Sequence, residues 1–224
     1  MEPSPARPPA GVSPHFWALL CEERLKDVAV LDVGTGSGRL ALALAPYCRR
    51  VVGIDRDAEA IEEATRRAKG RHLANVDFLV LDAEAPANYD DVMTEPRHPG
   101  LIVAHLCVSD RIIQNSSRSL GSGQALAFVA FHTDQWLETG RRSRFAYHED
   151  KARRVLTDCG FVVQHLEVER EMRRFDSVEA ALAAAIGLQE RWKTDGRWFH
   201  YMRFLEEGGR TLTRSHLIVK AHKR

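Results

Sequence analysis

Three glycines at alternate positions, Gly34, Gly36 and Gly38, follow a short apolar run that ends at Asp32. Glycine is needed where the backbone turns with positive φ and where a ligand lies against bare peptide. The spacing is GxGxG, whereas a dinucleotide site requires GxGxxG, and residue 39 is Arg rather than Gly. No GK[ST] follows, so a P-loop is also excluded. The residues predict a ligand-binding turn of another kind.

Two further acids end apolar runs in the same way. Asp55 closes the run Val51–Asp55, and Asp82 closes the run Val76–Asp82. The carboxyl ends of parallel strands are where α/β proteins bind ligands, so we expect Asp32, Asp55 and Asp82 to form a line along one sheet edge. At these places Asp55 can accept hydrogen bonds from both hydroxyls of a ribose, and Asp82 can accept one from an adenine amino group.

The elements that must position these residues alternate along the first part of the chain. Runs typical of strands occupy residues 28–32, 51–55, 76–82, 101–106 and 125–131, and runs typical of helices occupy 39–45 and 58–69. This alternation predicts an α/β fold with a parallel sheet and helices on both faces. Further along, helices are predicted at 148–159 and 178–189, and strands at 161–168 and 217–221.

The joint pattern VLDVGTGSG, GIDRD and FLVLDAE resembles the class I S-adenosylmethionine-dependent methyltransferases, from Val28 to about Phe131. The resemblance implies a Rossmann-like, mostly parallel seven-stranded sheet of order 3-2-1-4-5-7-6, in which strand seven is antiparallel. It also implies S-adenosyl-L-methionine as cofactor and S-adenosyl-L-homocysteine as product. The enzyme class it implies is an S-adenosylmethionine-dependent methyltransferase.

The resemblance assigns a role to each residue of the expected cofactor site. The glycine loop would cradle the methionine and ribose part of the cofactor, Asp55 would hold the ribose, and Asp82 with Ala83 would meet the adenine. Asp32 would either order the glycine loop or bind the cofactor's amino group. The residues of the expected cofactor site are Asp32, Gly34, Thr35, Gly36, Gly38, Asp55, Arg56, Asp82 and Ala83.

Two histidines are the candidate catalytic residues. His105 and His132 end the fourth and fifth strands, which face the methyl group in this fold. Each could be a base or a substrate contact, and the alternative is a histidine that hydrogen-bonds a loop carbonyl. A base is needed only if the acceptor must lose a proton. Cys107 lacks the preceding proline of enzymes that attack C5 of a pyrimidine, so we favour a packed core thiol.

The segment 172–209 is predicted to be a helical, aromatic-rich insertion between the last two strands that covers the acceptor site. Trp198, Phe199 and Tyr201 are its candidate substrate contacts. These aromatic side chains could line an apolar pocket, stack single-stranded bases, or pack the insertion onto the core. A proline-rich flexible tail at residues 1–11 is expected to precede the methyltransferase domain at 12–224.

The charge balance bears on the acceptor. The chain of 224 residues has 32 basic and 31 acidic side chains, a net charge of +1. This balance and the lack of an Asn-Pro-Pro-Tyr motif favour a small-molecule acceptor over nucleic acid. The alternatives are RNA or protein methylation, a non-catalytic binding module, and a dehydrogenase, which the glycine spacing disfavours. We predict no metal site, and the oligomeric state stays open.

Location is predicted from what the sequence lacks. No apolar stretch is long enough for a membrane helix, and no secretory signal is evident. The four cysteines show no metal-ligand or CxxC spacing, which indicates reduced thiols in a cytoplasm.

Overall fold

The computed structural model describes all residues except 1–6, 86–88, 90–91, 93–98 and 144. The chain divides into two compact units. A sheet unit comprises residues 1–130, 150–166 and 218–224, and a helical unit comprises residues 131–149 and 167–217. The last two strands contribute residues to both units.

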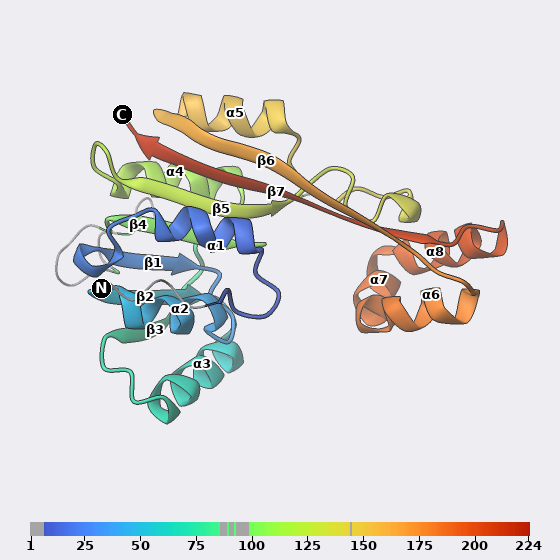
Figure 1. The fold of residues 1–224 in the computed structure, drawn as a ribbon, viewed down its shortest axis with the longest axis horizontal. Helices are drawn as coiled ribbons and strands as arrows, with labels where there is room; N and C mark the ends of the chain where they lie inside the picture. The colour runs from blue at the N-terminus through green and yellow to red at the C-terminus, as the bar shows by residue number, and fades with distance from the viewer. Residues whose placement is uncertain (1–6, 86–88, 90–91, 93–98, 144) are drawn as a thin grey trace. The chain divides into compact units, whose positions relative to one another are not determined.

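Seven strands form a single sheet in the order β3-β2-β1-β4-β5-β7-β6 (Figure 1). The strands are β1 (Ala29–Val33), β2 (Arg50–Asp55), β3 (Val76–Val80), β4 (Leu101–His105), β5 (Ala125–Phe131), β6 (Phe161–Arg174) and β7 (Thr211–Lys223). Strands β1 to β5 pair in parallel, and β7 runs against them. The predicted fold class and strand order are confirmed.

The last two strands are longer than their predicted ranges of 161–168 and 217–221. The added part of β6, Glu169–Arg174, consists mainly of charged residues and carries no apolar alternation. An apolar face is the signal by which a strand is recognised in sequence. Antiparallel backbone pairing needs no such face, so a charged segment can extend a strand without any pattern in the sequence that predicts it.

Among the residues that the structure describes, five α-helices accompany the strands of the sheet unit. They are α1 (Pro14–Cys21), α2 (Arg39–Leu44), α3 (Ala58–Gly70), α4 (Asp110–Ser119) and α5 (Glu149–Asp158). The sequence reading did not predict α4, because its ten residues, DRIIQNSSRS, are mostly polar. Two adjacent isoleucines, Ile112 and Ile113, are its buried apolar side chains, and the Ser109 hydroxyl caps its N-terminus.

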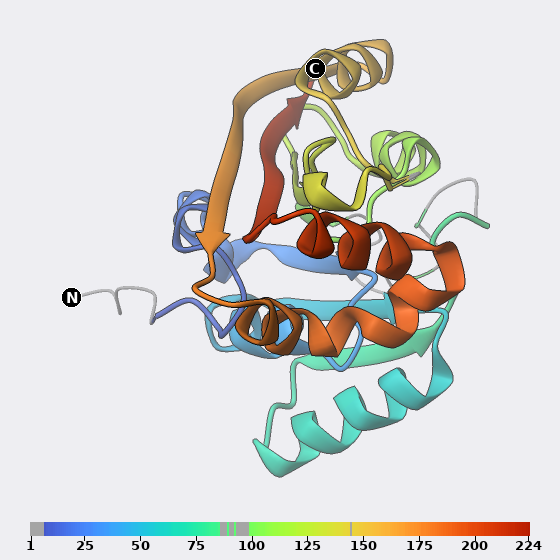
Figure 2. The same ribbon diagram turned by 90° about the vertical axis from the view of Figure 1, so that its right-hand side faces the viewer.

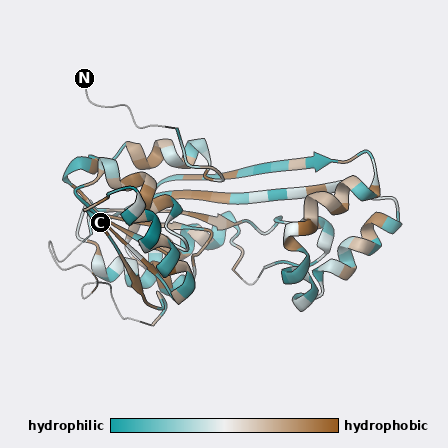
Figure 3. Cartoon of the chain, turned by 90° about the horizontal axis from the view of Figure 1, so that it is seen from below, coloured by the Kyte–Doolittle hydropathy of each residue, from teal (hydrophilic) through white to brown (hydrophobic). Residues whose placement is uncertain are grey.

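The core of the sheet unit lies on both faces of the sheet. Val30 and Val103 belong to a buried cluster that includes side chains of α1 and α2. Leu31 and Ile102 are the sequence neighbours of these two valines, so they point to the opposite face, and they are equally buried. The brown, hydrophobic strands of this unit in Figure 3 reflect burial on both sides.

The helical unit holds three consecutive helices, α6 (Val178–Ala185), α7 (Gln189–Asp195) and α8 (Arg197–Glu206), seen in orange to red in Figure 2. The predicted helix at 178–189 ends earlier, because Ile186–Leu188 form a 3-10 turn. Gly196, with φ of 80°, separates α7 from α8. None of the helices among the described residues is long and apolar enough to cross a membrane.

Aromatic rings form the core of the helical unit. The ring of Trp192 meets Trp136 at a centroid distance of 5.2 Å and Tyr201 at 5.6 Å, both edge-on. Edge-to-face pairs of this kind stabilise beyond the area they bury. The guanidinium of Arg197 lies over the Trp136 ring, 5.4 Å from its centroid. The unit therefore has its own apolar centre.

Candidate functional site

The carboxyl ends of β1 to β4 lie in register at one edge of the sheet unit. Val33 pairs with Ile54 of β2 and with Ala104 of β4. Asp55, the last residue of β2, pairs with Val80, the last of β3. The residues that follow each strand are thereby brought to the same edge, as the spacing of the acids predicts.

The glycine loop turns sharply after β1. Gly34, Gly36 and Gly38 all have positive φ, at 69°, 52° and 78°. The backbone N–H groups of Gly34 and Thr35 both donate to the Ile54 carbonyl, which ties the loop to β2. A Cβ at Gly38 would lie 2.8 Å from the Phe78 ring. Positive φ favours glycine at all three positions, and close packing adds to this requirement at Gly34 and Gly38.

Asp32 fixes the glycine loop through hydrogen bonds. Its carboxylate Oδ2 accepts from the Thr35 hydroxyl at 2.7 Å and from the Ala41 backbone N–H at 3.1 Å. Burial raises the pKa of Asp32 to about 7, although both hydrogen bonds act in the opposite direction. Of the two roles considered for Asp32, these contacts correspond to ordering the loop and the first turn of α2.

Asp55 joins the second strand to the tip of the loop. Its Oδ2 accepts from the Gly36 N–H at 2.8 Å, and its Oδ1 accepts from the Asp57 N–H at 3.0 Å. A Cβ built on Gly36 would meet no atom within 4 Å. The loop tip therefore opens onto unfilled space beside a half-buried carboxylate, which suits a ligand carrying hydroxyl groups. Arg56, next to Asp55, is exposed.

Arg67 of α3 is a loop contact that sequence reasoning missed. Its guanidinium donates to the Ser37 carbonyl at 2.9 Å and contacts the Ser37 hydroxyl at 3.1 Å. Arg67 is thirty residues from Ser37 in the chain. Only the packing of α3 beside the loop makes the contact visible, so no local signal could have found it.

The third acid lies at the end of β3. Asp82 is exposed, and its Oδ1 accepts from the Glu84 N–H at 2.9 Å. Ala83 is buried, and its carbonyl accepts from the Tyr89 hydroxyl at 2.9 Å and the Asn115 amide at 3.0 Å. Burial raises the pKa of Tyr89, so its hydroxyl stays protonated as a donor. Tyr89 and Asn115 are further residues that the sequence reading missed.

His105 ends β4 and contacts the start of α2. The Arg39 guanidinium lies 3.1 Å from His105 Nδ1. Guanidinium nitrogens are only donors, so Nδ1 must be the unprotonated acceptor in this contact. Arg39 also donates to the Ala10 carbonyl at 3.2 Å. The contact links the proline-rich start of the chain to the same edge of the sheet.

Cys107 packs directly beneath the glycine loop. A Cβ at Gly34 would lie 2.3 Å from the Cys107 sulfur. Burial, with smaller contributions from Asp55 and Asp32, raises the pKa of the thiol to about 11. A thiol with such a pKa is protonated near neutrality, and the thiolate is the nucleophilic form. Cys107 is only half-buried, so it packs against the loop rather than within the core, and its role as a core thiol stays a prediction.

His132 belongs to the helical unit and is buried in a polar network. Its Nδ1 accepts from the Asp134 N–H at 3.2 Å and contacts the Ser215 hydroxyl at 3.0 Å, so Nε2 carries the proton toward Glu149 Oε2 at 3.0 Å. Burial acts to raise the pKa of Glu149, but hydrogen bonds from its own backbone and from His132 leave it lowered.

The three candidate substrate aromatics occupy different environments within the helical unit. Tyr201 is fully buried, and its hydroxyl contacts the Thr211 carbonyl at 3.3 Å. Trp198 is half-buried against the same apolar cluster. Phe199 is 72% exposed, the most exposed large apolar side chain among the described residues. Their role as substrate contacts stays a prediction.

Comparison with known families adds a direct finding. Residues 25–209 match the family described as a methyltransferase domain. The chain belongs to this family. Its membership confirms the predicted class of methyltransferases.

Curated relatives match shorter parts of the chain. A 23S rRNA (uracil(1939)-C(5))-methyltransferase from Legionella pneumophila is 39% identical over 74 residues, which are 33% of this chain and 15% of that protein. A protein-L-isoaspartate O-methyltransferase from Parvibaculum lavamentivorans is 31% identical over 118 residues, 43% of this chain and 52% of that protein. The chain thus spans about half or less of the length of these relatives.

A solved structure resembles the whole fold. The YcgJ protein from Bacillus subtilis superposes with a TM-score of 0.66 at 16% identity, covering 94% of this chain and 98% of that one. At such identity the likeness concerns the fold alone. It agrees with the seven-stranded sheet described above.

Proposed function

We propose that this chain transfers the methyl group of S-adenosylmethionine to a small-molecule acceptor at the carboxyl edge of β1 to β4. The observation that carries the proposal is the open space at Gly36 beside the Asp55 carboxylate. The other loop glycines are crowded by neighbouring side chains, so the opening lies where a cofactor would rest against the backbone.

The residues at this edge would each bind a different part of the cofactor. Asp55 would accept hydrogen bonds from the ribose hydroxyls, helped by Arg56 beside it, and Asp82 with Ala83 would meet the adenine. Asp32 and Arg67 hold the loop in shape and need not touch the ligand. When bound, S-adenosylmethionine supplies an electrophilic methyl group, and the protein's part is mainly to position the acceptor and exclude water.

His105 is the residue we propose to contact the acceptor. It ends β4 next to the glycine loop, and Arg39 engages its Nδ1. His132 has both ring nitrogens bonded within the helical unit, so we give it the second place among the candidate bases.

Calorimetric titration tests the choice of cofactor. The chain should bind S-adenosylmethionine and S-adenosylhomocysteine, because the loop is GxGxG with acids at 32, 55 and 82. NAD should give no heat, because its pyrophosphate requires the GxGxxG turn. Heat with NAD and none with either sulfur compound would overturn the proposal.

An RNA acceptor is the second candidate, since relatives include RNA and tRNA methyltransferases. Labelled methyl transfer to total RNA and to a small-metabolite extract separates the two acceptors, and label entering the extract supports the small-molecule acceptor.

The variant Cys107→Ala tests whether an RNA acceptor would be attacked covalently. Activity should survive in this variant, because the raised pKa keeps the half-buried thiol protonated, whereas covalent attack on a pyrimidine would require it. A cytoplasmic location also stays a proposal, consistent with the free cysteines.

A further inference from the structure

Two histidines and a glutamate come together where the first turn of α1 meets β6. One ligand-type atom from each of His15, His165 and Glu167 lies within 4.8 Å of the other two. The two imidazole rings are edge-on, with centroids 4.8 Å apart. Imidazole nitrogen and carboxylate oxygen are the ligands by which proteins bind zinc and related divalent ions. The group therefore has the composition and the proximity of a metal site.

His15 is positioned by the start of α1. The Ser13 hydroxyl accepts from the backbone N–H groups of His15 at 3.1 Å and of Phe16 at 3.3 Å, so it caps the helix. The Phe16 side chain is fully buried, which fixes the first turn on the sheet unit. The backbone of His15 is thereby held in place, while its side chain can still change rotamer.

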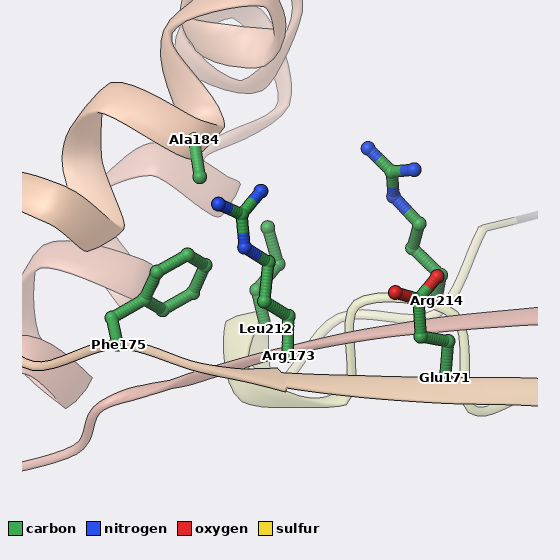
Figure 4. Close-up of a pocket in the computed structure, with 6 residues that line it drawn as sticks. All are labelled: Glu171, Arg173, Phe175, Ala184, Leu212 and Arg214. Atoms are coloured by element: carbon green, nitrogen blue, oxygen red, sulfur yellow. The ribbon is translucent and has the colours of Figure 1, made fainter.

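His165 and Glu167 are positioned by β6. They are two positions apart, so their side chains share one face of the strand. The same alternation reaches Glu171 and Arg173, which Figure 4 shows on one side of the ribbon. His15 and His165 both belong to the sheet unit. Glu167 follows His165 on the same continuous strand, so the strand itself sets the distance between those two side chains.

The spacing of the three side chains suits one small cation. Zinc binds imidazole nitrogen and carboxylate oxygen at about 2.0–2.2 Å, so two of its tetrahedral ligands are about 3.4 Å apart. From separations within 4.8 Å, the ligand atoms would approach one another by no more than about 1.5 Å. Rotation of the side chains supplies a change of that size without movement of the backbone.

Charge and burial favour a divalent transition metal. Histidine binds a metal in its neutral form, so the Glu167 carboxylate is the charged ligand of the three. His165 and Glu167 are half-buried, and Nε2 of His165 is a buried atom, so salt would screen a bound ion less than at an open surface. Two imidazoles favour zinc and its neighbours over Mg²⁺ and Ca²⁺, which bind oxygen ligands.

We propose that His15, His165 and Glu167 bind a divalent transition-metal ion, with water as the fourth ligand, and that this ion ties the first turn of α1 to β6. The two segments are far apart in the chain, so no spacing in the sequence predicts the site. The proposal does not rest on methyl transfer, because metal binding can be measured without cofactor or acceptor.

Zinc is the probe, titrated into the full chain by calorimetry, with Co²⁺ as a coloured substitute whose visible absorption reports its ligands. One equivalent of zinc should bind and raise the melting temperature. His15→Ala, His165→Gln and Glu167→Gln should each weaken zinc binding at least tenfold, since loss of an outer-shell partner alone costs tenfold or more. His15→Ala should fold normally, because the capping contact of His15 uses its backbone.

His200→Ala is the matched control, because His200 is an exposed histidine on α8. This variant should keep the native zinc affinity, and Mg²⁺ should not bind to the native chain. The proposal is overturned if no equivalent of zinc binds, if folded His15→Ala keeps the native affinity, or if His200→Ala weakens zinc binding as much. A thiolate charge-transfer band in the Co²⁺ spectrum would assign the ion to cysteine and would also overturn it.

Discussion

At the scale of single residues, Asp55 joins the glycine loop to the second strand and is the proposed ribose acceptor. Asp55→Ala should weaken the binding of S-adenosylhomocysteine at least tenfold, since hydrogen bonds to a charged group contribute about 1.5–3 kcal/mol each. Calorimetric titration measures the change. Asp57→Ala is the control, because Asp57 caps α3 and its loss should lower stability without changing affinity. Unchanged affinity in Asp55→Ala would exclude the ribose role.

Asp32 makes stability depend on pH in an unusual direction for an acid. Burial raises its pKa from 3.8 to about 7, so between these values the folded protein keeps a proton that the unfolded chain has lost. The stability due to that proton is present below pH 4 and lost as pH rises to about 7. Asp32→Asn removes this dependence, because the amide oxygen still accepts from Ala41 and does not titrate.

The variant Asp32→Asn should therefore gain stability relative to the native chain as pH rises. A shift of three pKa units corresponds to roughly 4 kcal/mol between pH 4 and pH 8. Urea unfolding at several pH values measures the difference. If that difference is the same at both ends of the range, Asp32 ionises normally in the folded protein.

At the scale of elements, Lys220 connects β7 to α1. Its ammonium is buried and bonds the Leu19 carbonyl at 2.9 Å, Glu22 at 2.9 Å and Glu23 at 2.7 Å. Lys220→Met should lower the free energy of unfolding by about 2 kcal/mol. This is less than the loss of a fully buried ion pair, because Glu22 is half exposed and can return to water.

Chemical denaturation measures the effect of Lys220→Met, with Lys69→Met as the control. Lys69 is exposed near the end of α3, so its replacement should change stability by less than about 0.5 kcal/mol. Equal effects of the two substitutions would show that the contacts of Lys220 between β7 and α1 do not contribute to the free energy of unfolding.

The elements also show what a sequence reveals and what it hides. Strands β1, β2, β4 and β5 were predictable because burial on both faces requires continuous apolar runs. Strand β3 was predictable from its apolar residues, although most of them are exposed or half-exposed. Helix α4 was not, because a single pair of isoleucines anchors it. The glycines and acids of the site follow from local spacing, whereas Arg67, Tyr89 and Asn115 reach it through packing between distant segments.

At the scale of the whole molecule, the segment between β6 and β7 carries the predicted acceptor contacts. Trp198→Ala with Phe199→Ala should impair acceptor turnover or specificity and leave cofactor affinity unchanged. Phe199→Ala alone is the cleaner variant, because this side chain is exposed and its loss should not disturb the core. Turnover with the identified acceptor and calorimetry with S-adenosylhomocysteine measure the two properties.

Loss of cofactor binding by the folded double variant would contradict this prediction and favour a packing role. Tyr201→Phe serves as the comparison, since Tyr201 is buried in the apolar core and contacts Thr211 through its hydroxyl. It should lower stability and leave turnover of the folded fraction unchanged. The variants at Trp198 and Phe199 thus test contact with the acceptor, and the variant at Tyr201 tests the stability of the helical unit.

The two ends of this segment meet at one backbone hydrogen bond, from the Phe175 N–H to the Arg210 carbonyl, 2.8 Å long. Topologically, everything between those residues is the turn of a hairpin. Insertions and deletions there leave the pairing of the flanking strands in register, so the turn can change in length and content while the catalytic domain keeps its frame. If the segment contacts the acceptor as predicted, the exchange of one contiguous stretch of gene would change acceptor preference without changing the chemistry.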